Sequence, residues 1–438
     1  MKKLVIGLGV VGALVFVGVP YVVGGIAESK IKEFMGQVNE QQAGAGKFEI
    51  LDYKRGFRSS ESSYRYQFSE AFKEMTQGVD SIDYRCEIDH GVMGVDYLCT
   101  LAQTGAYKEF LDQHLDGVDP FSMNGSISAF NSIDQNFVVE PLAMTLDDAT
   151  KVTLPEKIEI ESTFDQDISN YTFEGELPKL TIENKGLFDL NDVAIAGSFK
   201  EAYEGLYLGD AEMSVDELKI SEGDTELSFA KFEIDTAAKE IGDTITSSVA
   251  LNADNLVVPN QDGSKDEFSK IAMEIDIAGM DTKALIEYTK IVKEMQASFI
   301  ADGRKKNNQA GLKALAQLTP VLNDLLKKDL GVNVNSSFKL DGEKNNIGFD
   351  LKLLKDMELS EMMVFAFSPD EALKNFKGSV NVDIKKELIE KYPAINLAVA
   401  SLPLFVQNDE GVTMDLNLDS ELKLNGKVTT VAEIMALF

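Results

Sequence analysis

The sequence predicts an α+β protein with an N-terminal transmembrane helix, followed by a mainly antiparallel β-meander domain with packed helices. Three observations predict this fold class. The run from Leu4 to Ala27 carries no charged side chain. From Lys47 onward, apolar and polar residues alternate with a period of two, which indicates strands with one buried and one solvated face. Between Asp281 and Gly331 the apolar period changes to that of helices.

The uncharged run is long enough to cross a bilayer. A transmembrane helix needs about 20 apolar residues, and Lys2 and Lys3 before the run favour a cytoplasmic N-terminus. We therefore predict a single-pass protein of the bacterial inner membrane, anchored through residues 4–27, with the bulk of the chain in the periplasm. Gly25-Ile26-Ala27 also fits a signal-peptide cleavage site, so removal of the anchor stays open as an alternative.

Two β-hairpins are expected after a polar helix and linker that end near Gly46. In the first hairpin, alternating residues flank Arg55-Gly56, where we expect Gly56 to adopt a positive φ in a tight turn. In the second, the residues that share a face are Ile82, Tyr84, Cys86 and Ile88 on one strand and Val95, Tyr97, Cys99 and Leu101 on the next. A helix is expected near Thr104, and strands fill residues 151–258.

The second half alternates between helices and strands. Asp281 can cap a first helix, which Gly303 to Asn308 breaks. A second helix carries Leu312, Leu315 and Leu318. Thr319-Pro320 begins a third, which Gly331 closes. Strands return at 332–340 and 346–354, residues 383–406 are mostly helical, and 412–424 alternates again. The predicted domains are an anchor (1–27), a polar helix and linker (28–46), a β-rich meander domain (47–280) and an α+β domain (281–438) with a helical segment at 281–331.

The two cysteines are placed for a disulfide. If residues 91–94 form a four-residue loop, the register pairs His90 with Val95, Ile88 with Tyr97, and Cys86 with Cys99. Directly opposed residues of an antiparallel pair have Cβ atoms close enough for a disulfide after modest adjustment. The alternative, two buried free thiols, is reasonable only for a cytosolic domain.

The charge balance excludes several classes of partner. The chain has 42 basic and 73 acidic residues, which gives a net charge of −31. Nucleic-acid binding requires clustered Lys and Arg, so we expect no nucleic-acid partner. The acidic side chains are interpreted as a solvated surface that keeps the protein soluble.

No motif indicates catalysis, a metal or a cofactor. The chain has only two histidines and two cysteines, whose spacing does not fit a zinc site. Ser336-Ser337-Phe338-Lys339 matches S-x-x-K but lies in a strand-like run, where residues three apart point to opposite faces. The acidic segments 165–167 and 262–266 lack the full calcium-loop spacing, so solvated loops are the favoured interpretation and calcium binding stays open. We expect a protein that is not an enzyme and has no cofactor.

Three short motifs resemble those of a known family. The segment Tyr53-Lys54-Arg55-Gly56-Phe57-Arg58-Ser59-Ser60 is similar to the Y-x-R-G-aromatic-x-S motif of the YdgA-like family of bacterial envelope proteins, whose biochemical role is undefined. His90-Gly91 is similar to the family's H-G-P turn, although Val92 stands in place of the proline, and Asn425-Gly426-Lys427 to its terminal N-G-K turn. The resemblance implies an N-terminal anchor and residues with structural rather than catalytic roles.

The meander provides many strands with one apolar face, and the few predicted helices cannot cover all of them. Because a sheet must bury its apolar face, two functional hypotheses follow. The first is binding of a lipid or another apolar ligand in a groove, as in AsmA-like envelope proteins, whose meander-rich organisation is similar. The alternative to a groove is a second sheet that packs against this apolar face and buries it. The second hypothesis is a structural or assembly factor that acts through an envelope protein partner or as a homo-oligomer.

Overall fold

The computed structural model of the protein describes residue 39 and residues 46–56, 59–69, 80–90, 94–128, 132–165, 167–223, 225–260, 264–301, 308–362, 370, 373–419 and 421–436. Contacts divide the chain into two compact units. Unit 1 comprises residues 1–201 and 293–306, and unit 2 comprises residues 202–292 and 307–438. Each unit is described by itself.

Unit 1 is an antiparallel sheet with one helix, α4 (Gly105–His114), between β4 and β5. Its strands are β1 (Gly46–Arg55), β2 (Ser59–Phe68), β3 (Ser81–His90), β4 (Gly94–Leu101), β5 (Phe121–Ser128), β6 (Ser132–Val139), β7 (Leu142–Thr145), β8 (Lys151–Leu154), β9 (Ile158–Asp165), β10 (Asn170–Glu183) and the start of β11 (Gly186–Tyr203). Strands β1 to β6 pair in sequence order, β9 pairs with both β6 and β10, and the β7–β8 hairpin joins β10. Both predicted hairpins are therefore confirmed.

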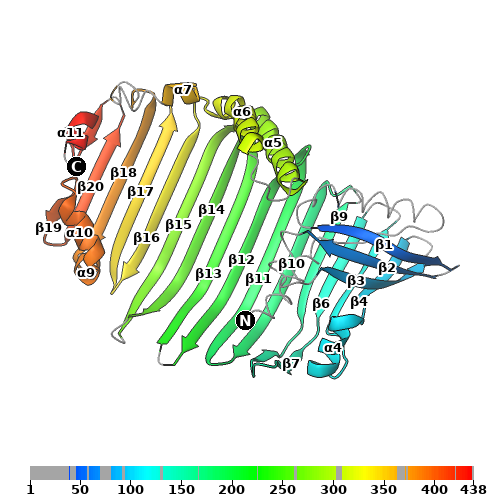
Figure 1. Ribbon diagram of the computed structural model, residues 1–438. Helices are drawn as coiled ribbons and strands as arrows, with labels where there is room; N and C mark the ends of the chain where they lie inside the picture. The colour runs from blue at the N-terminus through cyan, green and yellow to red at the C-terminus, as the bar shows by residue number, and fades with distance from the viewer. Residues whose placement is uncertain are drawn as a thin grey trace. The chain divides into compact units, whose positions relative to one another are not determined.

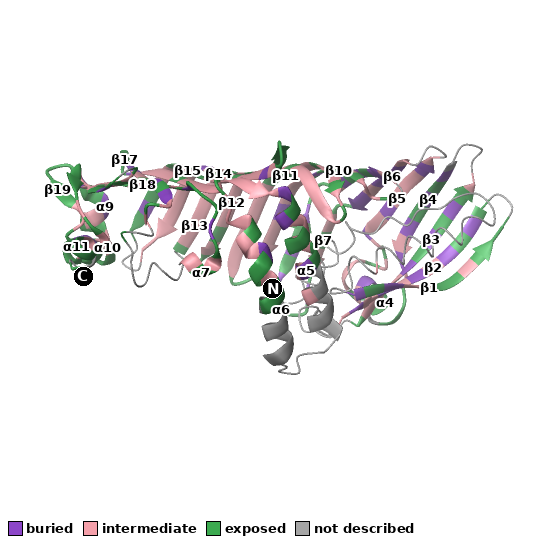
Figure 2. Ribbon diagram, turned by 90° about the horizontal axis from the view of Figure 1, so that it is seen from above, coloured by how far each residue is buried: buried purple, intermediate pink, exposed green. Residues whose placement is uncertain are grey.

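The core of unit 1 is built from alternate residues of these strands. Side chains from β1 to β6, β8 and β9 form one buried cluster, which includes Tyr64, Ile88, Ile133 and Phe137. The period-two pattern of the sequence produces this result because every second residue of a strand points to the same side. Figure 2 shows the buried positions concentrated on the strands of this unit.

Unit 2 is an antiparallel sheet of long strands (Figure 1). The strands are β12 (Leu206–Glu222), β13 (Thr225–Ile241), β14 (Thr244–Pro259), β15 (Lys265–Asp281), β16 (Gly331–Leu340), β17 (Glu343–Leu353), β18 (Phe376–Lys385), β19 (Val406–Asn408), β20 (Gly411–Leu418), β21 (Leu422–Leu424) and β22 (Lys427–Val428). They pair in the order β12-β13-β14-β15-β16-β17-β18-β20-β21-β22, and β19 pairs with β20.

The helices of unit 2 lie on one side of its sheet (Figures 1 and 2). They are the start of α5 (Thr282–Ala301), α6 (Asn308–Leu325), α7 (Leu359–Met362), α9 (Lys386–Lys391), α10 (Pro393–Ser401) and α11 (Val431–Met435). The predicted cap of α5 is confirmed, because the Ala284 amide donates to Asp281 Oδ1 at 2.9 Å. A capping box at Thr430 and Glu433 begins α11.

Three helical boundaries were predicted incorrectly. We expected a new helix at Thr319-Pro320, but α6 continues through Pro320. We expected Gly331 to close a helix, but it opens β16, and the left-handed residue after α6 is Asp329 with φ 74°. The segment 383–406 is helical only from Lys386, because β18 extends to Lys385. Pairing with β17 and β20 outweighs local helix propensity there.

The predicted α+β fold class with an N-terminal transmembrane helix, and the single-pass inner-membrane localisation drawn from it, are wrong. The described chain is mostly antiparallel sheet. No helix in the described part of the chain is both long and apolar enough to cross a membrane. Residues 4–27, where the anchor was placed, lie outside the described residues, as does most of the helix and linker expected at 28–46. A long uncharged run is necessary for a membrane span, but it does not establish one.

The predicted domain boundary at residues 280 and 281 lies inside unit 2. The strands on its two sides, β15 and β16, pair directly, with Ile275 opposite Val334. Helices α5 and α6 are inserted between these two neighbouring strands. The fold of unit 2 is consequently a single sheet with helical insertions, rather than a meander domain followed by a mixed domain.

Candidate functional site

Unit 2 presents a wide apolar surface on one face of its sheet. One row of directly opposed residues crosses eight strands from β12 to β20 and consists of Met213, Ile234, Leu251, Met273, Ser336, Ile347, Val382 and Met414. The adjacent row on the same face consists of Ala211, Thr236, Val249, Ile275, Val334, Phe349, Val380 and Leu416. We call these sixteen residues the apolar rows.

The apolar rows are open to solvent in the described part of the chain. None of the sixteen residues is fully buried. Ile347 is 44% exposed, Val249 39%, Met273 38% and Phe349 36%. Single exposed apolar residues are normal on protein surfaces, but contiguous apolar patches usually mark sites of interaction.

A coordinated break in alternation keeps this face apolar along the strands. Asp216, Lys231, Asp254 and Lys270 fall at one level across β12 to β15, where the pairing of each adjacent strand pair is interrupted. Lys231 and Lys270 have φ of 50° and 49°, and a left-handed residue shifts the alternation of a strand by one position. The rings of Phe229 and Phe232, on either side of Lys231, accordingly lie 5.3 Å apart.

The charged residues at this level lie away from the apolar rows. All four are exposed, and Lys231 Nζ lies 3.6 Å from Asp254 Oδ2. The break therefore places two successive polar residues of each strand on the opposite face. It also returns the next apolar residue to the apolar face.

Helical segments cover two margins of the apolar face. At one margin, Leu326 and Leu330, which follow α6, pack against a small cluster of Leu353, Met357 and Phe376. At another, Tyr392, between α9 and α10, has its ring 6.4 Å from that of Phe268 on β15. Between these margins, four of the sixteen apolar-row residues are exposed and the other twelve are partly buried.

The second margin is fixed by a buried carboxylate. Asp266 is 1% exposed, accepts a hydrogen bond from Tyr392 Oη, and lies 2.9 Å from Lys391 Nζ and 2.7 Å from Asn260 Nδ2. Burial alone would raise the pKa of Asp266, but these three donors together lower it below its ordinary value. The carboxylate is therefore ionised and paired, which suits a structural anchor for α9.

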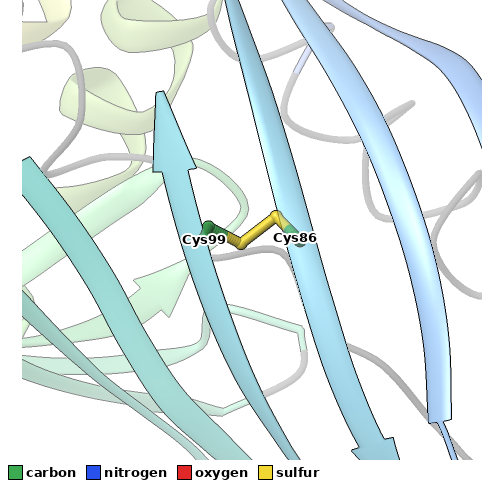
Figure 3. Close-up of a disulfide and its surroundings, with 2 residues drawn as sticks. All are labelled: Cys86 and Cys99. Atoms are coloured by element: carbon green, nitrogen blue, oxygen red, sulfur yellow. A yellow bond between two sulfur atoms is a disulfide. The ribbon is translucent and has the colours of Figure 1, made fainter. Parts of the chain in front are cut away.

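The predicted disulfide is confirmed. Cys86 on β3 and Cys99 on β4 are directly opposed and bonded, with Cα atoms 4.0 Å apart (Figure 3). The register is the one derived from the sequence, since Ile88 lies opposite Tyr97 and His90 opposite Val95.

Tyr53 and His90 converge on Ser60, the last residue of the first motif segment. Tyr53 Oη donates to Ser60 Oγ at 3.0 Å, and Ser60 Oγ lies 3.0 Å from His90 Nε2. Such a Ser–His contact also occurs in hydrolases, but Ser60 is 2% exposed, which favours a role in tying β1, β2 and β3 together. Ser60 is buried in alternation with Ser62 and Tyr64 along β2.

The other motif residues occupy strand ends and turns. Arg55 ends β1, Ser59 begins β2, and Phe57 and Gly91 lie outside the described residues. Gly56 does not have the positive φ that we expected. Glycine is required here for a steric reason, since a Cβ at this position would lie 2.5 Å from the Ser59 carbonyl oxygen.

The terminal motif forms the turn that we expected. Asn425 and Gly426 have φ of 51° and 78° between β21 and β22, and Lys427 pairs with Leu424. Asn425 Oδ1 also accepts a hydrogen bond from the Asp415 amide, and Asn425 Nδ2 donates one to the Leu404 carbonyl oxygen, both at 2.9 Å. The motif therefore fastens the last hairpin to β20.

Groups that could hold a metal ion are absent from the described residues. Ser336 and Lys339 of the S-x-x-K match both lie on β16, so the expected strand at this segment is confirmed.

Comparison with protein families identifies the chain's relatives. A model of bacterial proteins of unknown function, DUF945, matches residues 1–401. The chain belongs to this family. No curated protein and no solved structure matches it. The DUF945 match includes seven of the eight strands that carry the apolar rows, and only Met414 and Leu416 on β20 lie beyond it.

Sequence reasoning identified the strands of this DUF945 member but missed the continuity of its apolar face. The signal is a pair of polar residues between two apolar ones at matched places, as in Val215-Asp216-Glu217-Leu218 and Phe268-Ser269-Lys270-Ile271. A strict period of two assigns the two apolar residues to opposite faces, and only the pairing register shows that the breaks coincide.

Proposed function

We propose that this DUF945 member is a non-enzymatic binding protein whose apolar rows hold the acyl chain of a lipid. The observation that carries the proposal is the exposure of the rows: two adjacent lines of apolar side chains cross eight strands, and none of the sixteen residues is fully buried. A face of this kind is expected to bind an apolar partner.

The dimensions of the rows suit an extended hydrocarbon chain. Neighbouring strands lie about 4.8 Å apart, so eight strands span roughly 34 Å. Each methylene group removed from water contributes about 0.8 kcal/mol, so a chain with about ten buried methylenes would gain roughly 8 kcal/mol before the entropic cost of binding.

The absence of charge in the rows favours an acyl chain over an ionic ligand. Ser336 and Thr236 are the only polar residues among the sixteen, and neither is ionisable. The chain's net charge of −31 would repel anionic headgroups at close range. A neutral or zwitterionic lipid is therefore the preferred ligand.

A structural or assembly role is the second candidate, because an exposed apolar sheet face can also bind a protein partner. In that case Ile347 and Phe349, on one strand and 44% and 36% exposed, would contact the partner. The YdgA-like resemblance of the motifs is compatible with both functions, and we propose that the relationship extends to that group.

Native mass spectrometry and lipid extraction of the full chain, purified from a bacterial host, test the proposal. We expect near-stoichiometric lipid on the wild-type protein. Ile347→Asp should lose it, because the new carboxylate lies in the middle of a row. Asn346→Asp is the matched control: it adds the same charge one residue away but on the opposite face, so lipid should be retained.

Two outcomes would contradict lipid binding. A lipid-free wild-type protein that captures one protein partner through the Ile347 face would move the assignment to the assembly role. Equal lipid content in Ile347→Asp and Asn346→Asp would show that the lipid binds elsewhere.

A further inference from the structure

The opposite face of the same sheet carries a hollow of about 830 Å³, lined by residues of β14 to β18 and β20. By register, thirteen of its eighteen lining residues belong to the polar face. The other five are members of one apolar row: Met273, Ser336, Ile347, Val382 and Met414. The floor of the hollow is formed where small residues stand side by side: Ala272 lies opposite Ser337, and Gly348 lies between Asn335 and Asn381. We call this site the polar hollow.

The residue types around the polar hollow are unusual for strands. Asparagine is depleted in strands because its side chain competes for backbone hydrogen bonds. On β16 to β20, however, the polar face carries Asn333, Asn335, Asn346, Asn381 and Asn417. Positions that break a local propensity rule are where a functional requirement is expected.

The polar face of the neighbouring strands follows a different pattern. At comparable positions on β12 and β13 the residues are mainly acidic: Asp210, Glu212, Glu233 and Asp235. Solvation of a sheet face therefore does not require asparagine in this protein. The amides are concentrated at the hollow.

The amides around the hollow retain much of their hydrogen-bonding capacity. Asn335 Nδ2 donates to Asn333 Oδ1 at 2.6 Å, and Asn381 Nδ2 donates to Ser379 Oγ at 3.3 Å. Each amide offers two donor hydrogens and one acceptor oxygen, so further sites remain on both. Asn252 and Asn346 bring the number of amides in the lining to four.

We propose that the polar hollow binds a neutral polyhydroxylated ligand, of the oligosaccharide class. A sugar hydroxyl both donates and accepts, as an amide does. The carboxylates of Glu274, Asp383 and Asp415 in the lining can accept from further hydroxyls. These acids outnumber the single lining cation, Lys344, so an anionic ligand would be repelled.

The geometry also bears on the size and affinity of the ligand. The hollow extends across six strands, or roughly 24 Å at about 4.8 Å per strand spacing, which leaves room for several sugar units in a line. Its volume of about 830 Å³ lies within the usual range for ligand sites. Because the lining contains no aromatic ring on which a sugar could stack, we expect a dissociation constant in the millimolar range.

Saturation-transfer NMR and calorimetric titration of the full chain test this inference with defined probes. Cellohexaose, maltohexaose and chitohexaose represent neutral oligosaccharides, oligogalacturonate represents an anionic one, and an uncharged Gly-Ser peptide represents an extended backbone. We expect saturable binding of at least one neutral oligosaccharide and none of the anionic probe. The double variant Asn346→Ala/Asn381→Ala should weaken binding at least about tenfold, because two or more hydrogen bonds are lost.

Matched variants keep the test specific. Asn417→Ala removes an amide from the same face but outside the lining and should leave the affinity unchanged. Gly348→Gln fills the floor of the hollow, where a Cβ has 3.4 Å to its nearest neighbour, and should abolish binding without unfolding the sheet. No saturable binding of any neutral probe, equal affinity in all variants, or binding of the peptide alone would each overturn the inference.

Discussion

The two units use the same strand pattern and reach different degrees of burial. In unit 1 the inward residues of the strands are sealed: Ile133 is fully buried and Phe137 is 2% exposed. In unit 2 the corresponding apolar face remains accessible, with Ile347 and Phe349 44% and 36% exposed. Alternation with a period of two therefore specifies which face of a strand is apolar, but it does not specify whether anything covers that face.

The difference lies in what each apolar face packs against. In unit 1, side chains from eight strands meet in one cluster, so the sheet covers its own apolar face. In unit 2, the one cluster found among the described residues has three buried members, at the margin near α6. A stable unit needs only part of its apolar surface buried, and the exposed remainder is available for binding.

Substitution of one phenylalanine in each unit should produce the largest contrast. Phe137→Ala removes a buried ring and leaves a cavity, so we expect a loss of about 3–5 kcal/mol in the free energy of unfolding of unit 1. Phe349→Ala removes a ring that is already 36% exposed, and should cost unit 2 about 1 kcal/mol or less. Hydrogen exchange with mass spectrometry can resolve the units, since the chain has no tryptophan for fluorescence. Similar losses at both positions would mean that the face of unit 2 is covered in solution.

Removal of the disulfide should destabilise unit 1 by a smaller amount. The bond closes a loop with a sequence separation of 13, which the chain-entropy model values at about 3 kcal/mol. The variant Cys86→Ala/Cys99→Ala avoids burying a polar group and should lower the urea midpoint of unit 1 while unit 2 is unaffected. Reduced wild-type protein is the matched control. An unchanged midpoint on reduction would contradict the contribution assigned to the bond.

Local features of both units were predictable because they depend on neighbouring residues. The register that pairs Cys86 with Cys99 follows from the loop length and the alternation of the flanking strands. The cap at Asp281 and the turn at Asn425-Gly426 likewise depend on a few adjacent residues.

The candidate site could not be predicted from the sequence, because it depends on long-range pairing. Ile275 and Val334 face each other only because β16 returns beside β15 after two inserted helices. Lys231 and Lys270 are not residue types in which a positive φ is expected, so their left-handed conformation could not be predicted from residue type. Gly56 shows a further limit, since its constraint is a close backbone approach rather than a left-handed conformation.

Alkaline pH should destabilise unit 1 through a buried phenol. Burial raises the pKa of Tyr64 to about 12 from its ordinary value of 10.0. Below pH 10 the phenol is protonated in both the folded and the unfolded state, so the free energy of unfolding is not reduced. Between pH 10 and about 12 it ionises only in the unfolded state, so up to about 3 kcal/mol is lost. Tyr64→Phe should reduce this dependence in urea titrations at pH 9 and 11.5, whereas Tyr288→Phe, at a position in unit 2 that is 37% exposed, should not. Part of the dependence should remain, because burial also raises the pKa of Tyr66, Tyr84 and Tyr97.

The smallest effect on stability is expected for substitution of one glycine in each unit by alanine. These substitutions compare how much space each unit has for one added methyl group. A Cβ on Gly56 in unit 1 would lie 2.5 Å from the Ser59 carbonyl oxygen, which also accepts a hydrogen bond from the Gly56 amide at 2.8 Å. The backbone must shift to admit it, so Gly56→Ala should cost about 2 kcal/mol. A Cβ on Gly348 in unit 2 has 3.4 Å to its nearest neighbour, and Gly348→Ala should be neutral or stabilise by about 0.5 kcal/mol, because alanine restricts the unfolded chain. Thermal melts resolved by hydrogen exchange distinguish the two. If Gly348→Ala proved as costly as Gly56→Ala, the polar face of unit 2 would have to be packed against another surface, and the hollow proposed there would be closed.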